Sequence, residues 1–164
     1  MGTSRPHRHP TVKLADLIQQ SHFASPAQEA LLNVFATDSW ASGEITAAVA
    51  EHGITRSQYN VLRILRGHHP SRYTCSEIGC RLLDRTPDVT RLLIRLEKQG
   101  LVVRHRAEHD RRVVEVEITT AGLDLLGQLE EPVAKASERI THHLTDDELR
   151  TLSVLLEKMR TDQE

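Results

Sequence analysis

Cationic side chains gather in two neighbouring stretches of the chain, and their spacing suits contacts with nucleic acid. In the first stretch Arg91, Arg95 and Lys98 alternate with apolar residues. The apolar residues follow the spacing i, i+3, i+4, i+7 and are Val89, Leu92, Leu93 and Leu96. On a helix the two sets fall on different faces. One face can then pack on a core while the cationic face enters the major groove of DNA.

The second basic stretch follows at once and has the pattern of a β-hairpin. Residues 101–106 and 113–118 form its expected strands, and Asp110, Arg111 and Arg112 lie near the tip. In the second strand Val114, Val116 and Ile118 alternate with glutamates, which is the period of a half-buried strand. Arginines at a hairpin tip suit a narrow minor groove. A basic helix followed by such a hairpin indicates a winged helix-turn-helix.

Start and stop signals predict the helices that must position these groups. The first three are a short helix over residues 14–20, a long helix over 26–52 that ends at Gly53, and a helix over 56–67. An extended piece over 71–73 leads to a capping box, Thr74 to Glu77, which starts a helix through about residue 83. The recognition helix is expected over residues 86–99, with Thr86 as N-cap and Pro87 as its first residue.

Two further helices are predicted after the hairpin. Thr119 or Thr120 caps the first, in which Pro132 should introduce a kink. Its apolar stripe suggests a partner helix and comprises Leu126, Leu129, Val133, Ala136, Ile140 and Leu144. A second capping box, Thr145 to Glu148, opens the last helix. Its apolar face comprises Leu149, Leu152, Leu155, Leu156 and Met159.

The expected fold is mainly α with a small β-hairpin wing, a winged helix-turn-helix domain joined to a helical dimerisation region. Residues 1–24 are expected to be a flexible extension with a short helix, and residues 25–164 a single domain. Within this domain the winged helix covers about residues 56–118 and the dimerisation helices about 26–52 and 119–162.

Charge is distributed unevenly along the 164 residues, although the net charge is only −2. Residues 56–112 hold 13 Lys/Arg and 6 Asp/Glu, whereas residues 113–164 hold 5 and 12. A basic middle between acidic flanks favours local phosphate binding. The alternative is a solvated basic face without a partner.

Several other function classes lack their sequence signals. No nucleophile elbow, phosphate loop or metalloprotease motif is present, so an enzyme is not expected. The ten histidines show no zinc-type spacing, and no cofactor is expected. Cys75 lies where a helix dipole lowers a thiol pKa, but packing is the default role for it and for Cys80. Without an apolar span or a signal-peptide pattern, a cytoplasmic protein with no membrane partner is expected.

Residues from about 57 to 159 resemble the MarR family of bacterial transcriptional regulators. The matching blocks are residues 57–62, 89–97, 100–102, 110–112 and 118–122. The resemblance implies a homodimer that binds a pseudo-palindrome in double-stranded DNA, usually as a repressor. It also implies release from DNA by a small ligand, often phenolic or lipophilic.

By this resemblance Arg91 contacts bases, Arg111 and Arg112 reach the minor groove, and Asp110 pairs with an arginine to hold the wing tip in shape. The start of the recognition helix adds candidates for groove contacts, namely Thr86, Pro87, Asp88 and Thr90. Asp88 would accept from cytosine N4 or orient an arginine. A ligand pocket would use Trp40, Tyr59 and Arg63, although both aromatic residues could equally serve only in packing. The alternative function is a winged-helix module that binds proteins and not DNA.

Overall fold

The computed structural model describes residues 12–20, 22–83, 88–107, 110 and 112–161. The chain divides into two compact units, residues 1–41 and 42–164. The first unit holds α1 (Leu14–Leu17) and the beginning of α2 (Pro26–Ala50), which continues into the second. Helix α1 is shorter than the predicted 14–20. Gly53 follows α2 with φ +73°, a left-handed conformation that favours glycine, so the chain turns where the sequence predicted.

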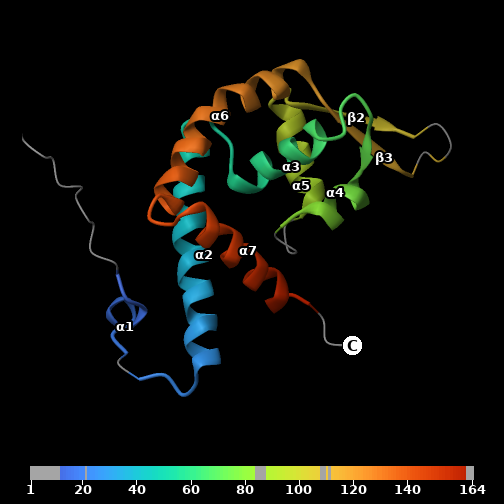
Figure 1. The fold of residues 1–164 in the computed structure, drawn as a ribbon. Helices are drawn as coiled ribbons and strands as arrows, with labels where there is room; N and C mark the ends of the chain where they lie inside the picture. The colour runs from blue at the N-terminus through green and yellow to red at the C-terminus, as the bar shows by residue number, and fades with distance from the viewer. Residues whose placement is uncertain (1–11, 21, 84–87, 108–109, 111, 162–164) are drawn as a thin grey trace, which may run out of the picture. The chain divides into compact units, whose positions relative to one another are not determined.

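The second unit contains the remaining helices and all the strands among the described residues (Figure 1). In chain order they are α3 (Arg56–Arg66), β1 (Tyr73–Thr74), α4 (Cys75–Arg81), α5 (Val89–Lys98), β2 (Val102–Arg106), β3 (Val114–Ile118), α6 (Thr120–Thr141) and α7 (Asp146–Met159). This confirms a mainly helical fold with a small sheet. No helix in the described part of the chain is long and apolar enough to cross a membrane.

Side-chain caps explain where most of these helices begin. Thr55 with Gln58, Thr74 with Glu77 and Thr145 with Glu148 form reciprocal capping boxes at α3, α4 and α7. In each box the threonine accepts from a free backbone N–H, and the third helical residue accepts from the N-cap N–H. Thr119 caps α6 by accepting from the Gly122 N–H. The predicted starts of α4, α6 and α7 are therefore confirmed.

The sheet has three antiparallel strands in the order β1-β3-β2. Tyr73 pairs with Val116, and His105 on β2 pairs with Glu115 on β3. The sequence predicted the β2–β3 hairpin but gave the segment before α4 only as an extended piece. Strand β1 has two residues, too few to show an alternating pattern, so its place in the sheet could not be predicted.

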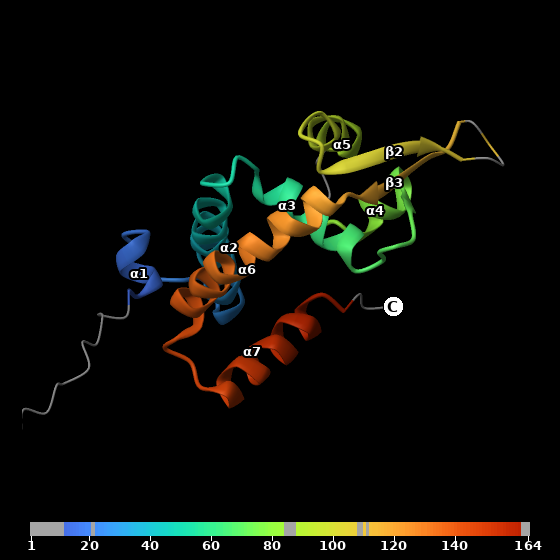
Figure 2. The same cartoon turned by 90° about the horizontal axis from the view of Figure 1, so that it is seen from above.

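One hydrophobic core joins α3, α4, α5 and α6 to the base of the hairpin. Its fully buried members include Val61, Leu62, Leu65, Ile78, Leu93, Leu96, Val116 and Leu129. Figure 2 shows α5 beside β2, on which it packs, and α6 beside α3. Leu126, Leu129 and Ala136 on α6 are buried in this single chain. The first part of the stripe assigned to a partner helix is thus covered by the chain's own core.

A close approach fixes the junction between the hairpin and α6. The Thr119 hydroxyl donates to the Gly100 carbonyl at 2.8 Å, and its N–H donates to the Leu101 carbonyl at 3.1 Å. A Cβ added to Gly122 would collide with the Leu101 carbonyl oxygen and would lie 2.7 Å from Ile118 Cγ1. Only glycine fits at position 122, because these atoms already occupy the space that a Cβ would need.

Candidate nucleic-acid interface

The recognition helix α5 begins at Val89, and its N-cap is Asp88. The Asp88 carboxylate accepts from the Arg91 backbone N–H at 3.1 Å. The prediction that Thr86 caps this helix and that Pro87 is its first residue is therefore wrong. An aspartate caps a helix as well as a threonine does, and its charge also favours the helix N-terminus. Thr86 and Pro87 themselves lie outside the described residues.

The two faces of α5 separate as the sequence predicted. Leu92, Leu93 and Leu96 are buried, and Val89 packs partly against the core. The candidate DNA-contacting residues that the structure describes on this helix and its cap are all exposed, namely Asp88, Thr90, Arg91, Arg95 and Lys98. A cationic face is therefore free to approach an anionic partner.

Arg91 is held in a defined orientation at the start of α5. Its Nε lies 3.1 Å from Asp88 Oδ2, although its side chain remains 80% exposed. A bidentate contact of this exposed guanidinium with guanine would use two of its N–H donors. Of the two roles considered for Asp88, the geometry matches the orientation of an arginine.

The wing tip contains a turn built by Asp110. Its Oδ1 accepts from the Arg112 backbone N–H at 2.9 Å, and its carbonyl accepts from the Val113 N–H at 2.9 Å. Asp110 thus shapes the tip through the backbone in the manner of an Asx-turn. Both Asp110 and Arg112 are exposed. Arg111 lies outside the described residues, so its contact with the minor groove stays a prediction.

One face of the hairpin is joined to the recognition helix. Arg104 on β2 donates through Nε to Glu97 on α5 at 2.8 Å, and its Nη2 donates to the same carboxylate oxygen. The hydrogen bonds from Arg104 hold the pKa of Glu97 below its ordinary value, so the carboxylate stays ionised at neutral pH.

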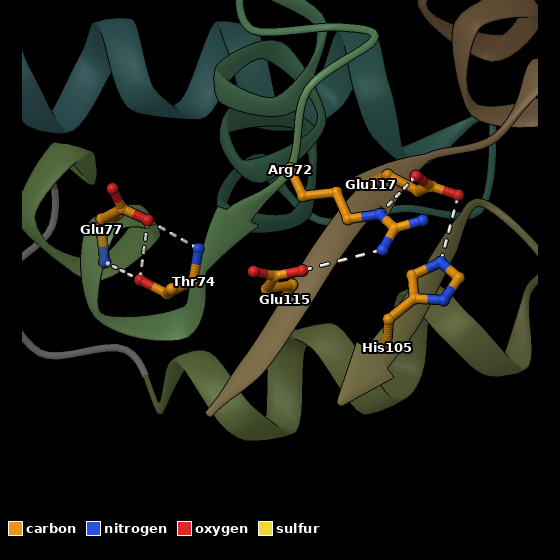
Figure 3. Close-up of polar contacts among 6 residues, drawn as sticks. All are labelled: Arg72, Thr74, Glu77, His105, Glu115 and Glu117. Atoms are coloured by element: carbon orange, nitrogen blue, oxygen red, sulfur yellow. Dashed lines mark hydrogen bonds and ion pairs between the residues drawn. The ribbon is translucent and has the colours of Figure 1, made fainter. Parts of the chain in front are cut away.

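The opposite face carries a second charged cluster, formed by Arg72, His105, Glu115 and Glu117 (Figure 3). Arg72 Nε lies 2.9 Å from Glu117 Oε2, and Arg72 Nη1 lies 3.7 Å from Glu115 Oε2. His105 Nε2 lies 3.1 Å from Glu117 Oε1. The hydrogen bond from Arg72 is the main reason that the pKa of Glu117 is lowered.

Sequence reasoning missed both of these arginine–glutamate contacts. Alternation along β2 could have placed Arg104 on the same face as Val102. No sequence signal could have placed Arg72 beside β3, because that contact depends on the pairing of β1 with β3.

Arg81 at the end of α4 is a further cation that the sequence reasoning did not select. Its Nη1 donates to the Glu77 carbonyl at 2.9 Å, and its Cζ lies 4.4 Å from the centre of the Tyr73 ring. The His68 ring stacks on the same tyrosine at 4.0 Å. The Tyr73 ring is thus in contact with both the guanidinium of Arg81 and the imidazole of His68.

The structure brings together two of the three candidate pocket residues. Arg63 Cζ lies 5.8 Å from the centre of the Tyr59 ring, one turn earlier on α3. Trp40 belongs to the first unit, and its side chain is about half exposed, at 49%. The ligand role of these residues stays a prediction.

Cys75 is the first residue of α4, but its thiol is not activated. Burial raises its pKa, and this effect outweighs the opposing influence of the nearby Arg104 charge. A protonated, half-buried thiol is a poor nucleophile. Cys75 packs against the core, in agreement with the default expectation of a packing role.

Comparison with known proteins identifies the family. The MarR family model matches residues 54–114. An HTH-type transcriptional regulator of Bacillus subtilis, YkoM, is 32% identical over 108 residues, which are 66% of this chain and 69% of that protein. The crystal structure of a MarR transcription factor from Planctomyces limnophilus shares 42% identity and a TM-score of 0.66, over 83% of this chain and 98% of that one. The chain belongs to the MarR family.

A structural relative within the MarR family has been solved in complex with DNA. A mutant MarR from Escherichia coli, solved with operator DNA, has a TM-score of 0.75 and 26% identity. The match covers 86% of this chain and all of that one. The homoprotocatechuate degradative operon repressor of Escherichia coli is 28% identical over 110 residues, 67% of this chain and 73% of that protein. This MarR family chain is a DNA-binding transcriptional regulator and not an enzyme.

Proposed function

We propose that this MarR family regulator represses transcription as a homodimer on a pseudo-palindromic operator. Helix α5 of each copy would enter a major groove, and each wing would enter the flanking minor groove. The observation that carries the proposal is the exposed cationic face of α5, from Arg91 to Lys98. Arg91, Arg95, Lys98 and Arg112, together with Arg111, would make the contacts with DNA.

Support for a homodimer comes from two helices, α2 and α7, whose apolar residues are exposed to solvent in the single chain. Helix α7 has no buried residue, and Leu152, Leu155 and Met159 are 42%, 54% and 55% exposed. On α2, Leu31 and Phe35 are 45% and 59% exposed. A second copy would cover such faces. Within residues 25–164, we assign the winged helix, about residues 56–118, to DNA and the helices on either side of it to dimerisation.

Sedimentation of the full chain tests this assembly. We expect a dimer at micromolar concentration, and we expect Leu152→Glu with Leu155→Glu to shift the chain toward monomer and weaken operator binding. A folded wild-type monomer that binds its operator with full affinity would contradict the proposal.

The regulatory ligand that we propose is a small phenolic acid that relieves repression. One relative is named for a homoprotocatechuate degradative operon, and homoprotocatechuate is a phenolic acid. On α3 the aromatic ring of Tyr59 and the guanidinium of Arg63 lie close together, and they offer stacking and a carboxylate partner. Addition of homoprotocatechuate should dissociate a fluorescent operator complex, and Arg63→Gln should raise the concentration required. An equal response in wild type and variant would remove Arg63 from the site.

Selection of bound duplexes from a random pool tests the DNA proposal directly. We expect an enriched two-fold symmetric site, and we expect affinity for it to fall steeply with salt because phosphate contacts release counterions. A weak salt dependence and no enriched sequence would favour the protein-binding module instead.

A further inference from the structure

The outward face of β3 would place negative charge close to DNA if the two glutamates there had no partner. Glu115 and Glu117 are two residues apart on one strand, so both side chains project from the same face of the sheet. They lie on the strand that leads back from the wing tip. Two ionised carboxylates on a DNA-binding hairpin would repel phosphates and each other.

Arg72 supplies the counter-charge for both carboxylates from outside the hairpin. Its Nε bonds to Glu117 and its Nη1 lies near Glu115, at 2.9 and 3.7 Å. Glu117 in turn contacts His105 on β2, so the cluster spans both strands of the hairpin (Figure 3). Two of the three guanidinium nitrogens of Arg72 therefore face the hairpin.

A second contact holds the hairpin from its other face. Arg104 on β2 bonds to Glu97 on α5, the helix assigned to the major groove. The base of the wing is thus joined to the recognition helix on one face and to the segment before β1 on the other. Pairs on both faces restrict the swing of the hairpin, and ordering it on DNA then costs less entropy.

We propose that Arg72 is a positioning residue for DNA binding, which holds the wing base so that the tip meets the flanking minor groove at a fixed offset from α5. The inference rests on the proposed role of the wing in the minor groove. Arg72 would determine how strongly the flanks of the operator contribute to affinity, without itself contacting DNA.

Arg66 offers a matched control for Arg72. Both side chains are 42% exposed, and each donates to a glutamate at 2.9 Å. Arg66 pairs with Glu130 on α6, whereas Arg72 pairs with the wing. Arg66→Gln therefore removes the same charge and the same kind of contact from a place outside the wing.

The first experiment measures affinity for two duplexes with one selected core and either A/T-rich or G/C-rich flanks. Wild type should prefer the A/T-rich flanks. We expect Arg72→Gln to lose about three- to tenfold on the A/T-rich duplex and much less on the other, so that the flank preference shrinks. Arg66→Gln should keep the preference. An unchanged preference in Arg72→Gln would overturn the inference, and no preference in wild type would also overturn the proposed role of the wing.

A double-mutant cycle separates positioning from direct phosphate contact. In the Glu115→Gln/Glu117→Gln background, Arg72 has no carboxylate to hold, so Arg72→Gln should cause little further loss of affinity. If Arg72 contacts phosphate, the same loss will appear in both backgrounds, and the salt dependence will fall by about one contact. That second result would overturn the inference, provided that circular dichroism shows all four proteins to be folded.

Discussion

At the scale of single residues, aspartates accompany the arginines that are assigned to DNA. Asp88 contacts both the backbone N–H and the guanidinium of Arg91, and Asp110 accepts from the backbone of Arg112. Each acid lies next to a surface that should bind an anion, and its charge alone would oppose that binding. Each aspartate therefore reduces the electrostatic attraction to DNA but fixes the local geometry, Asp88 at the start of α5 and Asp110 at the wing tip.

Arg91→Ala tests whether the side chain held by Asp88 reads a base. We expect a loss of about 1–3 kcal/mol per half-site and a relaxed base preference in a repeated selection, because a bidentate base contact is removed. Lys98→Ala is the control, since a phosphate contact should weaken all sequences about equally. If the selected site is unchanged in Arg91→Ala, then Arg91 contacts only phosphate.

At the scale of elements, the starts of the helices were the most predictable feature. The capping boxes of α4 and α7 depend on residues three apart, so they can be recognised in the sequence alone. The start of α5 was placed too early because Thr86 and Asp88 are both good caps, and no local rule decides between them. The exposed face of α5 was predicted because it depends only on helical spacing.

The wing tip gives a prediction in which hydrogen bonding and charge act in opposite directions. Asp110→Ala removes the acceptor for the Arg112 N–H, so we expect weaker operator binding although a negative charge is lost. Asp110→Asn keeps a side-chain oxygen that can accept the same bond and should bind at least as tightly as wild type. Fluorescence anisotropy at two salt concentrations measures both effects.

Asp124→Ala is the control for charge, because it removes an exposed acid from α6, outside the wing. If Asp110→Ala binds more tightly than wild type at both salt concentrations, Asp110 acts only as a repulsive surface charge.

At the scale of the whole molecule, the contacts that the sequence did not reveal are those between distant segments. Arg72 is 45 residues from Glu117, and Arg66 is 64 residues from Glu130. Periodicity and capping are local rules, so they identify elements and faces but not which faces meet. The pattern of a basic helix followed by a basic hairpin supplied the assignment of the winged helix, and the structure supplied its internal contacts.

Stability should fall at acidic pH because several carboxylates are stabilised in their ionised form. The pKa values of Glu77, Glu97 and Glu117 lie below the ordinary 4.5, owing to hydrogen bonds from Thr74, Arg104 and Arg72 respectively. A lowered folded-state pKa stabilises the fold above the unfolded-state pKa, and this contribution is lost as the pH falls through the folded-state value. We therefore expect Tm to be steady near neutral pH and to decline below about pH 4.5.

The same decline should be shallower in Glu97→Gln and Glu117→Gln, because neither variant has that carboxylate to protonate. Calorimetry at a series of pH values measures the slope for each protein. Equal slopes in wild type and both variants would show that these ion pairs contribute nothing to the pH dependence.

The contact at Gly122 has a consequence for how mutational data on this regulator would be interpreted. A scan of all substitutions would mark Gly122 as intolerant, and it would do so as strongly as it marks the arginines of α5. Every substitution adds at least a Cβ against the Leu101 carbonyl and Ile118, where the first wing strand begins and the last one ends. A derepressed allele at this position would therefore resemble a defect in operator recognition, although its cause would be a lack of room inside the fold.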